Sequence, residues 1–243
     1  MTSGYSVHEV LMRERASDIL IELLYSDELT VSELLKRIGG SASTIMRRLR
    51  ELLEVGLISE ESTRVWPYKR LIRLTEHGKR IAKMIRAMRL SEISVLNRSP
   101  ARWIILLSYL TGGKFESRTR LVKFLFILKN EYGVQIDYDF IWYKHGPFTK
   151  EILIDLDALE LFGLIKVHEE FLDYDKKTGE PIVRYTIILT DHGKKVAEDL
   201  LFKTPQGIVD ILKELIKKYY NMPLRDLLDY IYSKYANKKT QSF

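Results

Sequence analysis

The chain has 243 residues, 46% of them hydrophobic, which suggests one large domain or two ordinary ones, and its lack of cysteine excludes disulfides and thiolate metal sites. Its longest apolar runs, such as Trp103–Leu107, fall far short of the roughly 18 residues that a membrane span needs, and the N-terminus lacks a signal-peptide pattern, so we expect a cytoplasmic protein with no membrane partner. The formal net charge is +6, and its uneven distribution is more informative than its sum.

Two capping boxes mark helix starts in the first part of the chain. Residues 6–9 (SVHE) and 30–33 (TVSE) both read S/T-x-x-E, in which a hydroxyl and a carboxylate satisfy free backbone donors of the first turn. The first box predicts one continuous helix that ends near Ser26. The second predicts a short helix that ends at Gly39-Gly40.

A third helix, a hairpin and a fourth helix are expected next. Apolar residues recur at spacings of four and three between Ser41 and Gly56, which predicts a helix. Residues 57–74 contain two short apolar stretches around a polar turn, which is typical of a β-hairpin. Thr75 can then cap a further helix. This order of elements is that of a winged helix-turn-helix.

The stretch SASTIMRRLRELLEVGLI, followed after the hairpin by LTEHGKRIA, resembles the recognition helix and the segment after the wing in ArsR- and MarR-type DNA-binding regulators of archaea and bacteria. The resemblance covers about residues 7–90. It implies a winged helix over residues 1–97 whose partner is double-stranded DNA. A minority of winged helices bind RNA or protein instead.

The basic charge of the chain is concentrated in the same region. Residues 36–89 hold 14 Lys and Arg against 5 Asp and Glu, so the rest of the chain is net acidic. A block of this kind is typical of a surface that binds a polyanion, and nucleic acid is the leading candidate. A solvated basic surface is the alternative, although it would explain scattered charge better than this block.

The third helix and the hairpin supply the candidate DNA contacts. With its apolar residues facing inward, the N-terminal polar residues of the helix should face the major groove. We expect Arg47 to reach a base edge, because a guanidinium matches guanine O6 and N7. Arg64 in the wing is the candidate for the minor groove, or else an exposed loop arginine. The other expected contacts, chiefly to phosphate, are Ser43, Thr44, Arg48, Arg50, Lys69 and Arg70.

The second half of the chain repeats features of the first. LRELLEVGLI at residues 49–58 matches LDALELFGLI at 156–165 with an offset of 107, and LTEHGK at 74–79 recurs as LTDHGK at 189–194 with an offset of 115. The second hairpin should therefore be 8 residues longer. In each repeated motif we expect the threonine to cap a helix and the glycine to permit close packing. These matches predict a diverged winged-helix-like domain over residues 98–203.

The charge of the first domain is not repeated in the second. Residues 100–111 and 118–132 have helical patterns, residues 135–143 alternate like a strand, and residues 147–162 form the equivalent of the third helix. That helix is acidic and is not expected to bind phosphate, so this domain is the candidate surface for a protein partner. Its carboxylates are Glu151, Asp155, Asp157 and Glu160, against Lys150 alone.

A second resemblance covers about residues 99–236. The stretches SRTRLVKFLFIL, DYDFIWYKHGPFTKEILIDL and PLRDLLDYIYSKY resemble YwgA-type proteins and, more remotely, the SocA-like antitoxin domain. The resemblance implies a domain that contacts other proteins. The antitoxin pattern is only partly matched.

Two further helices are expected in the extension at residues 204–243. Because an apolar stripe on the last helix must be buried, it either docks on its own domain or forms a homodimer interface. A dimer through these helices or through the second domain would suit palindromic DNA half-sites. The stripe consists of Leu224, Leu227, Leu228, Ile231, Tyr232 and Tyr235.

The motifs of catalysis do not appear. The five histidines are not at metal-ligand spacing, and Thr111–Lys114 (TGGK) lacks the frame of a phosphate-binding loop, so we expect no catalytic residues, metal or cofactor. The expected fold is mainly α with small β-hairpins (α+β), as tandem winged helices with C-terminal helices. The expected function is sequence-specific DNA binding in transcriptional regulation. The alternatives are an archaeal winged-helix replication initiator that binds origin DNA, and a protein-interaction or antitoxin-like module.

Overall fold

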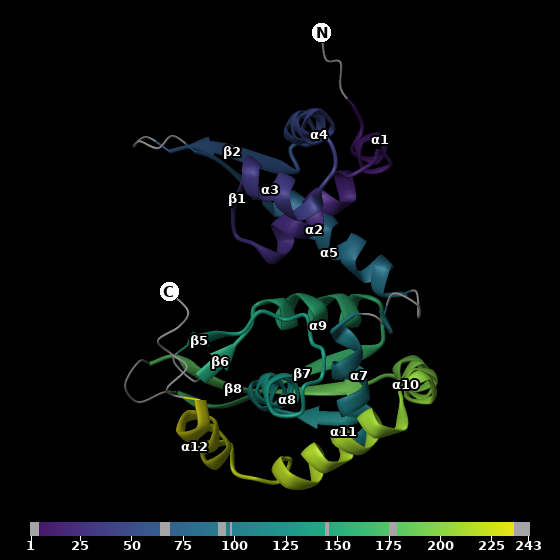
Figure 1. Cartoon of the computed structure of the whole chain (residues 1–243), viewed down its shortest axis with the longest axis vertical. Coiled ribbons are helices and arrows are strands. Elements are labelled where there is room, and N and C mark those ends of the chain that lie inside the picture. Colours follow the sequence, from purple (N-terminus) through teal and green to yellow (C-terminus); the bar gives the residue numbers. More distant parts are fainter. Residues whose placement is uncertain are drawn as a thin grey trace. The chain divides into compact units, whose positions relative to one another are not determined.

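The chain divides into two compact units, Met1–Arg89 and Leu90–Phe243, each built from helices around a small antiparallel sheet (Figure 1). The computed structural model describes residues 5–63, 69–91, 96–97, 99–143, 146–174 and 179–235. The α+β fold class predicted from the sequence is confirmed. Within the described ranges, no helix is both long and apolar enough to cross a membrane.

In the first unit, three helices pack on a sheet with strand order β1-β3-β2. Both predicted capping boxes form, at Ser6 and at Thr30. The inward-facing residues of the third helix, Ile45, Leu49 and Leu52, are at most 2% exposed, as the spacing predicted. The elements are α1 (Val7–Leu11), α2 (Ala16–Tyr25), β1 (Leu29–Thr30), α3 (Val31–Ile38), α4 (Ala42–Glu54), β2 (Ile58–Ser62), β3 (Arg70–Leu74) and α5 (Glu76–Ser91).

The prediction of one continuous helix up to Ser26 is wrong. The chain leaves the helix after Leu11, and Arg15 has a φ of 68°, a left-handed conformation that a helix interior does not contain. The carbonyl oxygen of Arg15 accepts a hydrogen bond from the amide of Ile19 at 3.0 Å, so Arg15 stands at the start of α2. The break allows α1 to contact α4 as well as α2.

The second unit has the same sheet connectivity, with strand order β4-β8-β7, and a large insertion. Where the first unit has the turn 39–41 between α3 and α4, the second has residues 131–150, which include a separate two-stranded sheet. The elements are α7 (Ala101–Leu110), β4 (Lys114–Glu116), α8 (Arg118–Asn130), β5 (Ile141–Tyr143), β6 (Gly146–Phe148), α9 (Glu151–Leu161), β7 (Ile165–Tyr174), β8 (Pro181–Leu189), α10 (Asp191–Lys203), α11 (Gln206–Tyr219) and α12 (Leu224–Tyr235).

Two element boundaries predicted for the second unit are wrong, and the insertion explains both. The strand expected over residues 135–143 is confined to Ile141–Tyr143, and the helix expected from residue 147 begins at Glu151. The cause is the pairing of Ile141–Tyr143 with Gly146–Phe148, which uses the start of the expected helix as a strand. The longer second hairpin is confirmed, since β7 and β8 pair over more residues than β2 and β3.

A repeated corner joins each hairpin to the helix that follows it. The hydroxyl oxygen of Thr75 accepts a hydrogen bond from the amide of Gly78 at 3.0 Å, and that of Thr190 accepts one from Gly193 at 2.9 Å. Each hydroxyl also donates, at 2.7 and 2.6 Å, to the carbonyl oxygen of the glycine just after the preceding helix. The predicted threonine caps are confirmed.

The glycine of each corner allows the backbone to approach closely. A Cβ atom added at Gly78 would lie 1.8 Å from the carbonyl oxygen of Leu57, and one at Gly193 would lie 1.9 Å from that of Leu164. Neither distance is possible for a real carbon atom, and the obstacle is backbone that cannot rotate away. The motif LTEHG/LTDHG therefore marks the same packed corner in both units.

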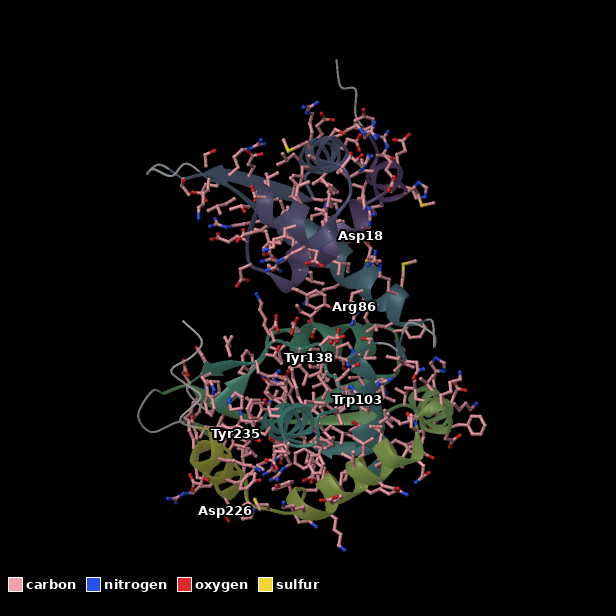
Figure 2. The ribbon with its side chains drawn as sticks, viewed as in Figure 1. Asp18, Arg86, Trp103, Tyr138, Asp226 and Tyr235 are labelled. Carbon is pink, nitrogen blue, oxygen red and sulfur yellow. The ribbon has the colours of Figure 1, made fainter. Side chains whose placement is uncertain are left out.

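The last two helices belong to the second unit. Helix α11 contacts α7 and α8, and α12 contacts α8 and β6. In α12, Leu227, Ile231 and Tyr235 are buried, and the ring of Tyr235 packs edge-on against Phe126 with 5.1 Å between centroids (Figure 2). The stripe thus docks on its own unit through these three residues, which was the first of the two alternatives, while Leu224, Leu228 and Tyr232 remain half-buried.

The corner glycine of the second unit should be essential for stability. Replacing Gly193 with alanine should lower the free energy of unfolding by about 3 kcal/mol, because the new methyl group collides with the Leu164 carbonyl. Urea unfolding followed by tryptophan fluorescence measures this, since Trp103 and Trp142 lie in this unit.

Gly207 in α11 is the matched control. A Cβ atom there would meet nothing within 4 Å, so Gly207→Ala should leave stability unchanged or raise it by at most about 1 kcal/mol. Equal effects of the two substitutions would contradict the role assigned to the corner.

Candidate nucleic-acid interface

Helix α4 begins in a cluster of hydroxyl groups. Gly39 and Gly40, with φ of 70° and 90°, turn the chain from α3 into α4. The Ser41 hydroxyl oxygen caps the helix by accepting from the amide of Thr44 at 3.1 Å, and it lies 2.9 Å from the hydroxyl oxygens of both Ser43 and Thr44. Hydroxyls beside the free amides of a helix N-terminus form a surface suited to phosphate oxygens.

Two arginines lie on the exposed face of α4. Ser43, Arg47 and Arg50 are exposed, and their spacing of four and three residues places them on one side of the helix. Among the residues that the structure describes, neither guanidinium has an ion-pair partner. Their charges and donor groups are therefore available to a ligand.

The prediction that Arg48 faces outward and binds phosphate is wrong. Arg48 is only 3% exposed, its Nε donates to the carbonyl oxygen of Glu14 at 3.0 Å, and its guanidinium is paired with Glu51. The reason lies in the helical period, because residue 48 is three after Ile45 and four before Leu52 and so belongs to the buried stripe.

A buried carboxylate holds α4 against the loop that precedes α2. Glu51 is 4% exposed and accepts from Arg13 at 2.6 Å as well as from Arg48. Arg13 belongs to the connection between α1 and α2, so this one carboxylate links two segments that are distant in sequence. Because a buried charge is costly without partners, the three groups stabilise the fold only as a set.

Two of the predicted DNA contacts, Lys69 and Arg70, lie on the hairpin, and they differ in the contacts that they make. Lys69 is exposed, and its amide donates to the hydroxyl of Thr63 at 2.8 Å. Arg70 forms a two-pronged ion pair with Glu60, with 2.6 Å between Nη2 and Oε2, and this contact lowers the pKa of Glu60. Arg70 would have to exchange this partner to bind phosphate. Arg64 lies outside the described residues.

One cation beside the turn was missed by sequence reasoning. The left-handed Arg15 directs its guanidinium toward the turn before α4, so that a Cβ atom at Gly40 would lie 3.7 Å from Arg15 Nε. Its charge is shared with Asp18, at 3.5 Å. The available signal was the run Met12–Arg15, where the apolar spacing of the predicted first helix is interrupted.

The equivalent helix of the second unit presents a different surface. Asp155, which aligns with Arg48, is fully buried and accepts from the hydroxyl of Tyr138 at 2.8 Å, so its expected place among the exposed carboxylates is wrong. Asp157, which aligns with Arg50, is exposed, as is Glu160. Ile154, which aligns with Arg47, is buried. The outward face of α9 is therefore acidic where that of α4 is basic.

One comparison with known proteins, a protein-family model, agrees with the description of the first unit. Residues 16–61, from α2 into β2, match the family model described as a helix-turn-helix domain, and the first unit contains such a domain. A search of curated protein sequences gave no match. A chain from a solved structure titled "Nse1-Nse3-Nse4 complex" aligns with 86% of this chain and 98% of its own length, at 9% identity and a TM-score of 0.27. A likeness at that level supports no argument about fold or function.

The Glu51 carboxylate should be needed to hold α4 in place. Glu51→Gln keeps the shape of the side chain but leaves the buried guanidinium of Arg48 without a counter-charge. We expect the first unit to lose about 3 kcal/mol of stability, measured by thermal unfolding monitored by circular dichroism.

Glu54 provides the control on the same helix. Its side chain is exposed, so Glu54→Gln should change stability by no more than about 0.5 kcal/mol. If Glu51→Gln unfolds at the wild-type temperature, the buried network is not what positions α4.

Proposed function

We propose that this protein binds double-stranded DNA by placing the N-terminal half of α4 in the major groove, and that it regulates transcription. The observation that carries the proposal is the exposed pair Arg47 and Arg50, without ion-pair partners among the described residues, on the helix that follows the turn of a helix-turn-helix domain. This is the helix that enters the groove in such domains. The resemblance to ArsR- and MarR-type regulators favours transcription over other uses of DNA binding.

The proposed contacts divide by their place on α4. Arg47 is one turn into the helix and can reach a base edge, where its fork matches guanine. Ser43 and Thr44 surround the free amides of the first turn and would bind a phosphate on the flanking backbone. Arg50 lies further along the same face and would contact phosphate. Lys69 adds a cation from the hairpin.

The second unit does not share this role in our proposal. The face of α9 is acidic, and carboxylates repel a phosphate backbone instead of displacing its counterions. The insertion at residues 131–150 also separates α8 from α9, so the pair does not have the short turn of a helix-turn-helix. Neither the comparisons nor the described residues favour a replication initiator or an antitoxin module.

Arg47 should determine sequence preference. Once selection from random duplexes has supplied a preferred site, Arg47→Ala should weaken binding to it by about 1–3 kcal/mol and relax the preference at one base pair. Fluorescence anisotropy with the preferred duplex and with single-base variants measures both effects.

The matched control is Arg225→Ala, which removes an exposed arginine from a helix of the second unit. It should leave affinity and preference unchanged. An Arg47→Ala protein that selects the same site with the same affinity would refute base reading by α4.

Binding should also depend steeply on salt. Neutralising phosphates releases counterions, so the logarithm of the association constant should fall linearly with the logarithm of salt concentration. Arg50→Ala should weaken all duplexes alike and reduce that slope by about 1. Titrations at several salt concentrations measure it, and a slope near zero for the wild-type protein would contradict phosphate-driven binding.

A further inference from the structure

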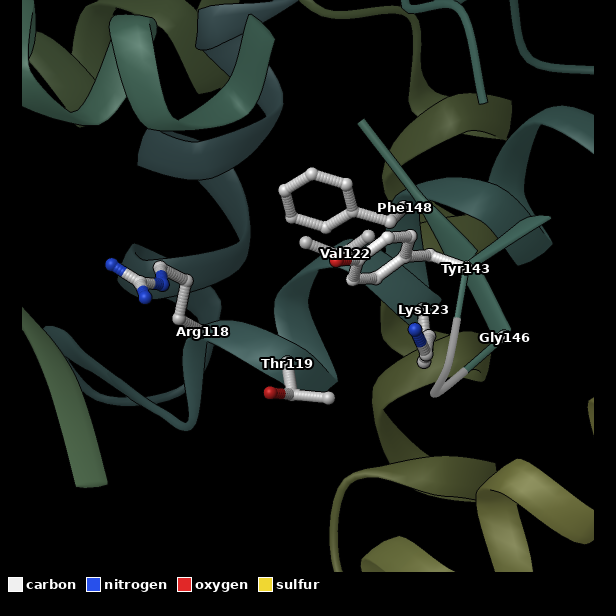
Figure 3. Close-up of a pocket in the computed structure, with 7 residues that line it drawn as sticks. All are labelled: Arg118, Thr119, Val122, Lys123, Tyr143, Gly146 and Phe148. Carbon is white, nitrogen blue, oxygen red and sulfur yellow. The ribbon is translucent and has the colours of Figure 1, made fainter. Parts of the chain in front are cut away.

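The second unit contains a cavity of about 200 Å³ between α8 and the β5–β6 hairpin (Figure 3). Val122 and Lys123 line it from α8, and Tyr143 and Phe148 line it from the two strands. Arg118, in the first turn of α8, lies at another part of its wall. The cavity combines an apolar lining with two cationic side chains.

Lys123 is a buried cation with little compensation. Lys123 is 2% exposed, and its ammonium donates to the carbonyl oxygen of Pro147 at 2.7 Å. No carboxylate pairs with it among the described residues. An ammonium has three donors, and a buried charge without a counter-charge is costly, which is reflected in the pKa of Lys123, lowered by burial to about 8.

The backbone of the hairpin passes close to this ammonium. Gly146 has a φ of 81°, and a Cβ atom there would approach Lys123 Cε to 3.7 Å and Nζ to 3.8 Å. The rings of Tyr143 and Phe148 lie 6.1 Å apart at an angle of 41° and form an aromatic wall beside it. A molecule that fits must therefore offer an anion to Lys123 and a flat apolar surface to the rings.

We propose that this cavity binds a small organic acid, with its carboxylate on Lys123 and its planar apolar body against Tyr143 and Phe148. A carboxylate brings one negative charge and matches one ammonium. A phosphate group carries more charge and more acceptor oxygens than a single buried ammonium can satisfy. Arg118, whose guanidinium is held over the ring of Tyr185 at 3.8 Å, adds positive potential at the wall. The proposal does not depend on the DNA-binding function of the first unit.

Benzoate is a suitable probe, because it joins a carboxylate to a flat ring. Calorimetric titration of the full chain should show saturable binding of benzoate, and weaker or no binding of benzyl alcohol and of inorganic phosphate. Lys123→Met should weaken benzoate binding at least tenfold. Lys129→Met is the control, since Lys129 is on the same helix and its ammonium also donates to a carbonyl, that of Tyr138 at 2.6 Å, but it does not line the cavity.

A second variant covers the case in which Lys123→Met does not fold. Tyr143 is 60% exposed, so Tyr143→Ser should fold normally, as circular dichroism can verify, and should still weaken benzoate binding severalfold. The proposal is overturned if benzoate does not bind the wild-type chain, or if benzyl alcohol or phosphate binds equally well. It is also overturned if benzoate binding survives Lys123→Met or, where that variant does not fold, survives Tyr143→Ser.

Discussion

Both units are organised around a point where a glycine of one helix rests on a backbone carbonyl. The Cα of Gly78 packs against the Leu57 carbonyl, and that of Gly193 packs against the Leu164 carbonyl, at distances that exclude any side chain. Because this carbonyl belongs to the connection between a helix and the first strand of a hairpin, the contact fixes three elements together. The threonine hydroxyl of each corner strengthens it by bridging the two segments.

This corner helps to fix which side of α4 is exposed. Its C-terminal end is tied to the hairpin and α5 through Thr75, and its middle is tied to the segment before α2 through Glu51. With both parts held, the exposed side is set by the helical period alone. Arg47 and Arg50 face outward for that reason, whereas Arg48 between them is part of the core.

Local rules were enough to predict much of the fold. Capping boxes, stop glycines, hairpins and the repeated motif depend on neighbouring residues and short spacings, and they were correct. The break at Arg15 depends on a single left-handed residue, which leaves little trace in a hydrophobic pattern. Residues 134–140 alternate between buried and exposed as a strand would, with Val134, Ile136 and Tyr138 inside, yet only residues 141–143 find a partner strand. An alternating apolar pattern indicates which side chains are buried. Strand pairing also needs a neighbouring strand, which the sequence does not identify.

The candidate site is less predictable than the fold, because the charge of a residue does not show whether the helical period buries it. The charge of Arg48 suggests an outward position, but its spacing from Ile45 places it inside, and the same holds for the charged Asp155. Both are buried charges that the fold accommodates with specific partners, Glu51 for the first and Tyr138 for the second. Lys123 donates to a carbonyl oxygen, and among the described residues no carboxylate pairs with it; it differs from the other two in bordering a cavity. Among the described residues, a buried ammonium that has no counter-charge and borders an open space favours a ligand as the missing partner.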